Sequence, residues 1–180
     1  TAPASAAPKG KPAPSEKADK ADKGKKDAAP KSNQVGSYGD WGAFTAQGKG
    51  KTCYALAKPK DRAPATLKRD DAYIFISNRP SENVRNEVSV IMGFPMTDAK
   101  TPAPKSEPRA EIGTNTFELV AKGANAWLKN PAEEGRFIEA MKRGQKLVVR
   151  AASLKGNSSV DTYSLAGVGD ALARIHKDCP

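Results

Sequence analysis

Two cysteines have the best-defined chemistry in this chain. Cys53 lies near the start of the patterned region, and Cys179 is the second-last residue. A disulfide between them would tie the C-terminus to an early strand, and in the chain-entropy model it removes roughly 4–5 kcal/mol of unfolded-state entropy. The alternative is two unrelated free thiols, but a buried free thiol is unusual at a chain end with the polar neighbours Lys177 and Asp178. The pair therefore predicts a disulfide and an oxidising compartment.

The other residue types with catalytic chemistry form no recognisable site. His176 is the only histidine, and a catalytic triad or a zinc site needs several converging ligands. We expect His176 to be a solvated helix residue. The Gly-x-Gly segments at 48–50 and 167–169 extend to neither a phosphate loop nor a dinucleotide fingerprint, so they predict turns. The sequence thus predicts no catalytic residue, no metal ligand, no cofactor and no enzymatic activity.

Two pairs of adjacent carboxylates have structural explanations. Asp70 and Asp71 precede a predicted strand, and adjacent side chains of a strand point to opposite faces, so these two should not converge. Glu133 and Glu134 follow Pro131 in the expected first turn of a helix, where acidic side chains favour the macrodipole. We interpret the second pair as helix capping.

Five basic residues form the densest basic patch of the predicted domain: Lys58, Lys60, Arg62, Lys68 and Arg69. They bracket a predicted loop over 59–69, and Tyr54 and Tyr73 lie nearby in sequence. The formal net charge of +10 favours polyanions such as an anionic glycan, lipopolysaccharide or nucleic acid. A solvated basic loop is the alternative. Single-stranded nucleic acid is disfavoured because stacking aromatics are few and the compartment is oxidising.

The chain divides into a tail and one domain. Residues 1–34 are rich in Lys, Pro and Ala and contain no Val, Ile, Leu, Met or aromatic residue. Such a segment cannot bury enough apolar surface to offset its ordering entropy. We therefore predict a disordered tail over 1–35 and a single β domain over 36–180.

Strand and helix patterns within the domain predict a mostly β fold. The expected strands are residues 40–45, 52–58, 72–77, 86–93, 116–121, 126–128, 146–153 and 160–165. Two brief helices are expected, at about 131–143 with Phe137, Ile138 and Met141 facing the core, and at about 169–177. The loops 59–69 and 95–110 carry no predicted strand. Because strands and helices do not alternate, we expect a single antiparallel β-sandwich, or a partly closed barrel, with two short helices.

No run of 18 or more apolar residues occurs, so no integral membrane segment is predicted. The chain begins at Thr1 without an apolar signal core, as a secreted protein does after its signal peptide is removed, and as a trimmed chain also does. Together with the expected disulfide, this start favours a periplasmic or secreted, cell-surface location.

Short motifs at both ends of the domain carry a family resemblance. Gly39-Asp40-Trp41 precedes Cys53 within Thr-Cys-Tyr-Ala-Leu-Ala, and the far end carries Tyr-Ser-Leu-Ala-Gly at 163–167 and Asp-Ala-Leu-Ala at 170–173. A helix containing Phe137 and Met141, then Gly144 and a strand at 146–149, lies between them. Over about 140 residues this layout resembles the invasion-associated locus B family of alphaproteobacterial envelope proteins.

The resemblance implies a secreted or periplasmic β-rich domain with no known enzymatic chemistry. Founding members are associated with entry of a pathogen into host red cells, and the family offers no catalytic residues. This chain departs from the better-known members in its long tail and its sparse cysteines. We expect a non-enzymatic protein that binds an envelope or host-surface component, with a polyanion-binding module as the alternative. The sequence does not specify an oligomeric state.

Individual residues have physical roles that do not depend on the family. Trp41 should bury a large apolar area at one end of the core. Gly167 and Gly169 should let the chain turn from the last strand into the last helix. Leu172 and Ile175 should pack that helix onto the sheet, where Cys179 would lock it to the strand of Cys53.

Overall fold

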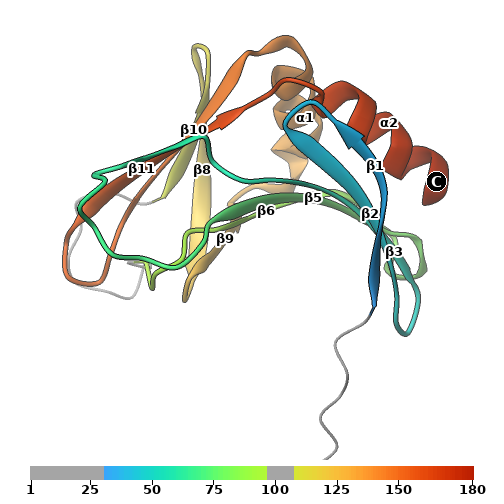
Figure 1. The fold of residues 1–180 in the computed structure, drawn as a ribbon, viewed down its shortest axis with the longest axis horizontal. Helices are drawn as coiled ribbons and strands as arrows, with labels where there is room; N and C mark the ends of the chain where they lie inside the picture. Colours follow the sequence, from blue (N-terminus) through green and yellow to red (C-terminus); the bar gives the residue numbers. More distant parts are fainter. Residues whose placement is uncertain (1–30, 97–107) are drawn as a thin grey trace, which may run out of the picture.

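The computed structural model describes residues 31–96 and 108–180. The predicted disordered tail lies outside the described residues up to residue 30, as does most of the Pro-rich loop. Within the described ranges the predicted fold class is confirmed. The domain is mostly β, with two α-helices and one antiparallel sheet that folds over on itself without closing (Figure 1).

Among the residues that the structure describes, eleven strands form the sheet, in the order β1-β2-β3-β5-β6-β9-β8-β7-β10-β11-β4. Their bounds are β1 (Ser32–Tyr38), β2 (Trp41–Gln47), β3 (Lys51–Ala57), β4 (Asp61–Ala63), β5 (Tyr73–Arg79), β6 (Val84–Ile91), β7 (Arg109–Ile112), β8 (Asn115–Lys122), β9 (Asn125–Leu128), β10 (Lys146–Ala152) and β11 (Ser158–Ser164). The helices are α1 (Glu134–Arg143) and α2 (Val168–Asp178), with 3₁₀ turns at Pro80–Glu82 and Pro131–Glu133.

The sheet folds into two halves along strand β8. The first half contains β1, β2, β3, β5, β6 and β9, and the second half contains β7, β10, β11 and β4. The first residues of β8 pair with β7, and its last residues pair with β9. The chain also crosses directly between the halves, since β3 leads into β4 through residues 58–60. In this crossing the amide of Lys60 donates to the carbonyl of Thr162 at 2.8 Å. The edge strands β1 and β4 do not pair with each other, so the hydrogen-bond ladder stays open.

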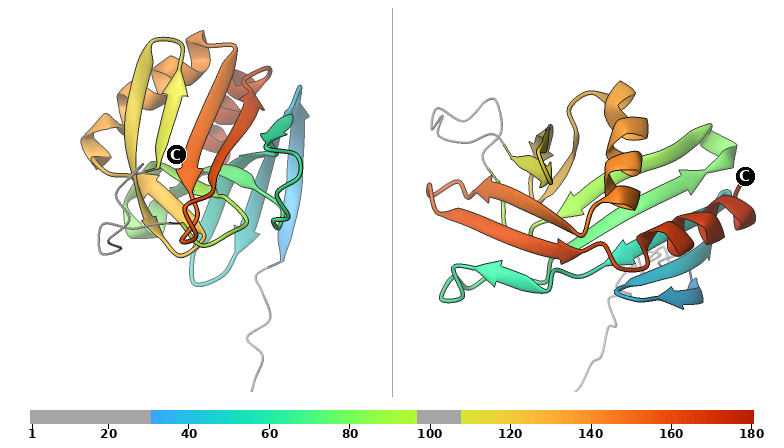
Figure 2. Two further views of the ribbon diagram at one scale, coloured as in Figure 1. Left: turned by 90° about the vertical axis from the view of Figure 1, so that its left-hand side faces the viewer. Right: turned by 90° about the horizontal axis from the view of Figure 1, so that it is seen from above.

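The core fills the space between the sheet halves and the two helices. Strand residues alternate as the pleat requires, so that Cys53, Ala55 and Ala57 of β3 are buried while the residues between them are half-buried. The largest fully buried side chains include Trp41, as predicted, and Phe117. Figure 2 shows both helices on the same side of the first sheet half.

Helix α1 buries the predicted residues Phe137, Ile138 and Met141. The predicted capping by Glu133 is wrong in detail, because neither Glu133 nor Glu134 makes a side-chain cap. Asn130 caps the preceding 3₁₀ turn instead, accepting a hydrogen bond from the amide of Ala132 at 3.1 Å. The acids still lie in the first turn of the helix, where the dipole favours them.

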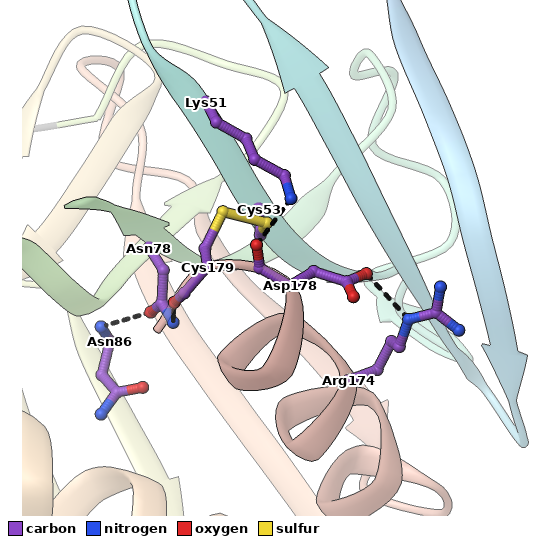
Figure 3. The surroundings of a disulfide bond; sticks show 7 residues. All are labelled: Lys51, Cys53, Asn78, Asn86, Arg174, Asp178 and Cys179. Carbon is purple, nitrogen blue, oxygen red and sulfur yellow. Dashed lines mark hydrogen bonds and ion pairs between the residues drawn. A yellow bond between two sulfur atoms is a disulfide. The ribbon is translucent and has the colours of Figure 1, made fainter. Parts of the chain in front are cut away.

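Helix α2 is fixed to the sheet by the predicted disulfide, which is confirmed (Figure 3). Cys53 and Cys179 are both buried, with Cα atoms 5.8 Å apart. The amide group of Asn78 donates to the carbonyl of Cys179 at 3.2 Å, and Lys51 Nζ donates to the carbonyl of Asp178 at 2.6 Å. The disulfide and these two hydrogen bonds therefore help to hold the C-terminal end of α2 on the sheet.

His176 is not the solvated residue that the sequence predicts. It is half-buried on α2, and its Nε2 lies 2.6 Å from Oδ1 of Asn86. Burial lowers the pKa of His176 below its ordinary 6.5, and the positive charges of Arg85 and Lys142 lower this pKa further. The neutral imidazole is thus the form that the folded protein favours.

Three strands are absent from the sequence prediction. Strand β1 begins at Ser32, inside the range assigned to the tail, so the domain starts earlier than residue 36. Its pairing with β2 shifts register between Gln34 and Gly36. Strand β4 lies within the predicted loop over 59–69, and β7 begins at the end of the predicted loop over 95–110. Both strands are short and stand next to prolines in the sequence, so they show no strand pattern.

Two turns meet where the sheet halves join. The amide of Asp40 donates to the carbonyl of Ala166 at 3.0 Å, and the indole of Trp41 donates to the carbonyl of Ser164 at 2.9 Å. Gly39 and Gly167 both have positive φ angles, of 58° and 88°. A Cβ on Gly167 would overlap the carbonyl of Tyr38. Gly167 therefore has the predicted turning role, whereas Gly169 lies within the first turn of α2.

We predict that the double variant Cys53→Ala/Cys179→Ala unfolds with a free energy about 2–5 kcal/mol lower than the parent, because its unfolded chain is no longer cross-linked. Urea unfolding followed by circular dichroism measures the difference. Lys51→Gln is the control, since it removes one hydrogen bond of the same helix end and leaves the disulfide. A double variant as stable as the Lys51→Gln variant would contradict the prediction.

We predict that His176 makes the domain less stable in acid. Because its folded-state pKa lies below the ordinary 6.5, the unfolded chain binds the proton more tightly. This contribution is complete above about pH 6.5 and is lost progressively as the pH falls from there through the lower pKa of the folded state. Urea midpoints at pH 7.5 and 5.0 should therefore differ more for the parent than for His176→Gln. Equal pH dependence in both proteins would refute the assignment to His176.

Candidate functional site

Two of the five predicted basic residues form ion pairs at the surface. Lys58 Nζ lies 3.3 Å from Oδ2 of Asp71 and also stands over the ring of Tyr73, 5.1 Å from its centre. Lys60 pairs with Asp40. Of the adjacent acids, Asp71 pairs through its carboxylate with Lys58, while Asp70 contributes its backbone carbonyl to Arg62. These cations are partly neutralised by their own domain.

Two further members of the basic patch turn inward, towards one buried carboxylate. Arg62 Nε lies 3.3 Å from Oδ1 of Asp161, and Arg69 Nη1 lies 2.9 Å from the same oxygen. Arg62 also donates to the backbone carbonyls of Asp70 and Met92, at 2.7 and 3.0 Å. The Arg69 side chain is only 3% exposed and Asp161 is fully buried. These arginines hold the segment after β4 against β11.

The buried carboxylate sits in a polar stripe along the inner side of β11. Ser159, Asp161 and Tyr163 alternate along the strand and are all buried. Burial raises the pKa of Asp161, and the charges of Arg69 and Arg62 oppose that rise. Burial and the charge of Asp161 also raise the pKa of the Tyr163 phenol. The hydroxyls of Ser159 and Tyr163 have no hydrogen-bond partner among the described residues.

Lys68 is the one predicted basic residue that remains exposed without an ion pair among residues 31–96 and 108–180. The structure therefore does not gather the five side chains into one free basic surface. A polyanion site at this patch stays a prediction. Charge density along the sequence could not reveal the inward turn of Arg62, because its partner Asp161 lies 99 residues away.

A row of aromatic side chains crosses the outward side of the first sheet half, opposite the side on which the core and α2 lie. The rings of Phe44 and Tyr54 stack almost parallel with centres 5.2 Å apart. Tyr54 approaches Phe75 at 5.7 Å, and Phe75 approaches Tyr73 at 6.1 Å. These rings come from β2, β3 and β5, and all four are half-buried. Their neighbours on each strand point inward to the core.

Aliphatic side chains and a tryptophan continue this row across the sheet. Five residues are paired in succession across neighbouring strands and so lie on the same side of the sheet. They are, in order, Leu56, Phe75, Ser89, Trp127 and Val120. Val120 is 46% exposed. We call this surface the outer face, and its apolar members are Phe44, Tyr54, Leu56, Tyr73, Phe75, Ile91, Val120 and Trp127.

Neither α-helix covers the outer face. Helix α2 packs on the inner side of β1, β2, β3 and β5, and α1 contacts β6 and α2 (Figure 1). A shallow hollow of about 330 Å³ adjoins Phe44 and Leu56 and is also lined by Lys58 and Lys60. Ion pairs lie at the margins of the face, such as Arg79 with Glu87 at 3.0 Å. The result is an apolar surface with a charged rim.

The sequence contains a signal for this face that the strand prediction does not use. In Tyr73-Ile74-Phe75-Ile76 both alternating sets are apolar, so both faces of the strand need cover or a partner. Ile74 and Ile76 face the core, and the aromatic residues face outward. Exposed apolar patches with a polar rim are typical of interaction sites.

The chain matches no protein-family model, no curated protein and no solved structure.

In the part of the chain that the structure describes, no cluster of three or more His, Cys, Asp or Glu side chains is arranged to hold a metal ion. Within the same ranges, neither helix has the length and apolar character needed to cross a membrane.

We predict that Asp161→Asn destabilises the domain by about 3–5 kcal/mol, because it leaves two partly or fully buried guanidinium groups without their counter-charge. Chemical denaturation measures the change. Asp71→Asn is the matched control, and it should leave the unfolding midpoint nearly unchanged because its ion pair is exposed to solvent. Similar effects of the two substitutions would show that Asp161 has no special structural role.

Proposed function

We propose that this chain is a non-enzymatic binding domain of the invasion-associated locus B type, acting in the periplasm or at the cell surface. Its outer face binds an envelope or host-surface component. The observation that carries the proposal is the aromatic row of Phe44, Tyr54, Phe75 and Tyr73, which neither helix of the described residues covers and which extends across the sheet through aliphatic side chains. These rings are half-buried and Val120 is 46% exposed, and an apolar patch of this kind with a polar rim is typical of an interaction site.

The disulfide supports an extracytoplasmic location. Bonds of this kind form and persist in the periplasm and outside the cell, whereas reducing systems keep cytosolic thiols free. The Cys53–Cys179 bond closes most of the domain into one loop. Such a cross-link suits a domain that has to remain folded outside the cytoplasm.

The composition of the outer face favours binding over catalysis. Interface centres are enriched in Tyr, Trp and Phe, and their charged residues collect at the rim. The same arrangement occurs here, with aromatic rings at the centre and the Arg79–Glu87 and Lys58–Asp71 pairs at the margin. Rings that already stack on one another lose little side-chain entropy on binding, so the surface is pre-organised.

A polyanion-binding module is the second candidate. The net charge of +10 and the unpaired Lys68 favour it. This candidate differs from the first in its salt dependence. Binding through lysines weakens steeply as salt rises, whereas binding through an apolar face persists.

We predict that the full chain co-sediments with purified envelope fragments or host-cell membranes, and that Tyr54→Thr/Phe75→Thr reduces the bound fraction at least fivefold. Threonine retains strand propensity, so the substitution removes the rings while preserving the sheet. Binding by the parent should persist at high salt. The assay compares bound protein by quantitative gel analysis across a salt series.

Val148→Thr is the control for this experiment, because Val148 lies half-buried on the outward side of β10, away from the aromatic row. It should bind like the parent. Loss of all binding at moderate salt, with the aromatic variant indistinguishable from the parent, would favour the polyanion module. Absence of binding to either fraction would remove the proposed role.

A further inference from the structure

A pocket of about 340 Å³ lies beside the turn between β10 and β11, away from the outer face. Its walls are apolar, from Leu67, Phe94, Pro95 and Leu154. Leu154 is 53% exposed, which is unusual for a leucine in this domain. The outer face does not use any of these residues, so the pocket needs an explanation of its own.

Backbone contacts join two of the segments that form the pocket. The amide of Leu154 donates to the carbonyl of Pro95 at 3.2 Å, and the amide of Ser153 donates to the carbonyl of Asn157 at 2.9 Å. Ser153 and Met96 also form an isolated antiparallel β-bridge. These bonds hold the β10–β11 turn against the residues that follow β6. The walls contributed by Pro95 and Leu154 are therefore fixed relative to each other.

Unpaired positive charge gathers at this pocket. Lys68 and Lys155 line it, and both are exposed with no ion pair to any residue within the described ranges. Arg69 lies beneath, with its guanidinium carbon 6.0 Å from the ring centre of Phe94, and is fixed there by Asp161. By contrast, Lys58 and Lys60 of the predicted basic patch have carboxylate partners.

We propose that this pocket binds an anionic amphiphile with a single short acyl chain and a carboxylate head. The apolar walls accept the chain, and Lys68 and Lys155 attract the head at the rim. A pocket of about 340 Å³ lies at the small end of ligand sites, which suits one short chain and not a two-chain lipid. Two free lysines are also too few to follow a nucleic acid backbone, which polyanion sites contact at many phosphates.

The test is a nuclear magnetic resonance titration of the full chain with three probes: octanoate, 1-octanol and acetate. Octanoate carries both recognised parts, 1-octanol lacks the charge, and acetate lacks the chain. We expect octanoate to shift the amides of residues 67–69 and 153–157 in a saturable 1:1 manner. Its affinity should be at least tenfold higher than that of 1-octanol, and acetate should not saturate.

Variants assign each part of the recognition. Lys68→Gln and Lys155→Gln should each weaken octanoate binding at least threefold and leave 1-octanol binding unchanged. Leu154→Ser should weaken both ligands. Lys49→Gln is the matched control, because Lys49 is an exposed lysine in the turn between β2 and β3, and it should change neither affinity. All four positions are exposed, so the variants should fold, and their amide spectra verify this.

Several outcomes would overturn the proposal. These are no saturable shift with octanoate, equal affinity for 1-octanol, or no effect of the lysine substitutions. Binding of octanoate only after residues 97–107 are deleted would show that this segment of the chain is the occupant. Binding to anionic phospholipid vesicles without any octanoate binding would instead make the region a bilayer contact. Failure of the outer-face experiment has no bearing on these results, because the two sites share no residue.

Discussion

The two halves of the sheet depend on one close contact between two backbone turns. The backbone segments 38–40 and 166–167 approach each other so closely that a side chain on Gly39 or Gly167 would collide with a carbonyl of the opposite segment. The amide of Asp40 and the indole of Trp41 donate hydrogen bonds across this contact. Because α2 starts directly after Gly167, the same contact sets the direction of the helix and brings Cys179 to β3. The disulfide then fixes an arrangement that the turns have already defined.

Most of the fold can be predicted from local patterns, because its longer strands alternate and its helices carry apolar residues at helical spacing. The exceptions have physical reasons. Ser32, Asn33 and Gln34 show no strand pattern of their own, and they become a strand only because β2 offers a partner. Strands β4 and β7 have only three and four residues, and their local sequence predicts a proline-rich loop. They are strands because pairing with their neighbours in the sheet outweighs this local preference.

The candidate sites were less accessible to prediction than the fold. Charge density groups Lys58, Lys60, Arg62, Lys68 and Arg69 by their closeness in sequence, but only the folded chain shows that Asp161 draws the two arginines inward. A buried ion pair of this kind depends on one carboxylate far away in sequence. The aromatic residues of the outer face are visible in the sequence, yet their outward direction follows from which alternate set faces the core. In the folded chain α2 packs against β2, β3 and β5 on the side of the aliphatic set.

The edges of the sheet have a consequence for self-association. An open sheet ends in strands with unpaired amide and carbonyl groups, which can recruit strands from other molecules and lead to aggregation. Here β1 carries a register shift between Gln34 and Gly36, and β4 spans only three residues and is followed at once by Pro64. Neither edge offers a long, regular ladder to a neighbouring chain. Within the described residues both edges are therefore poor templates for strand addition, and contacts with other molecules are directed to the faces of the sheet.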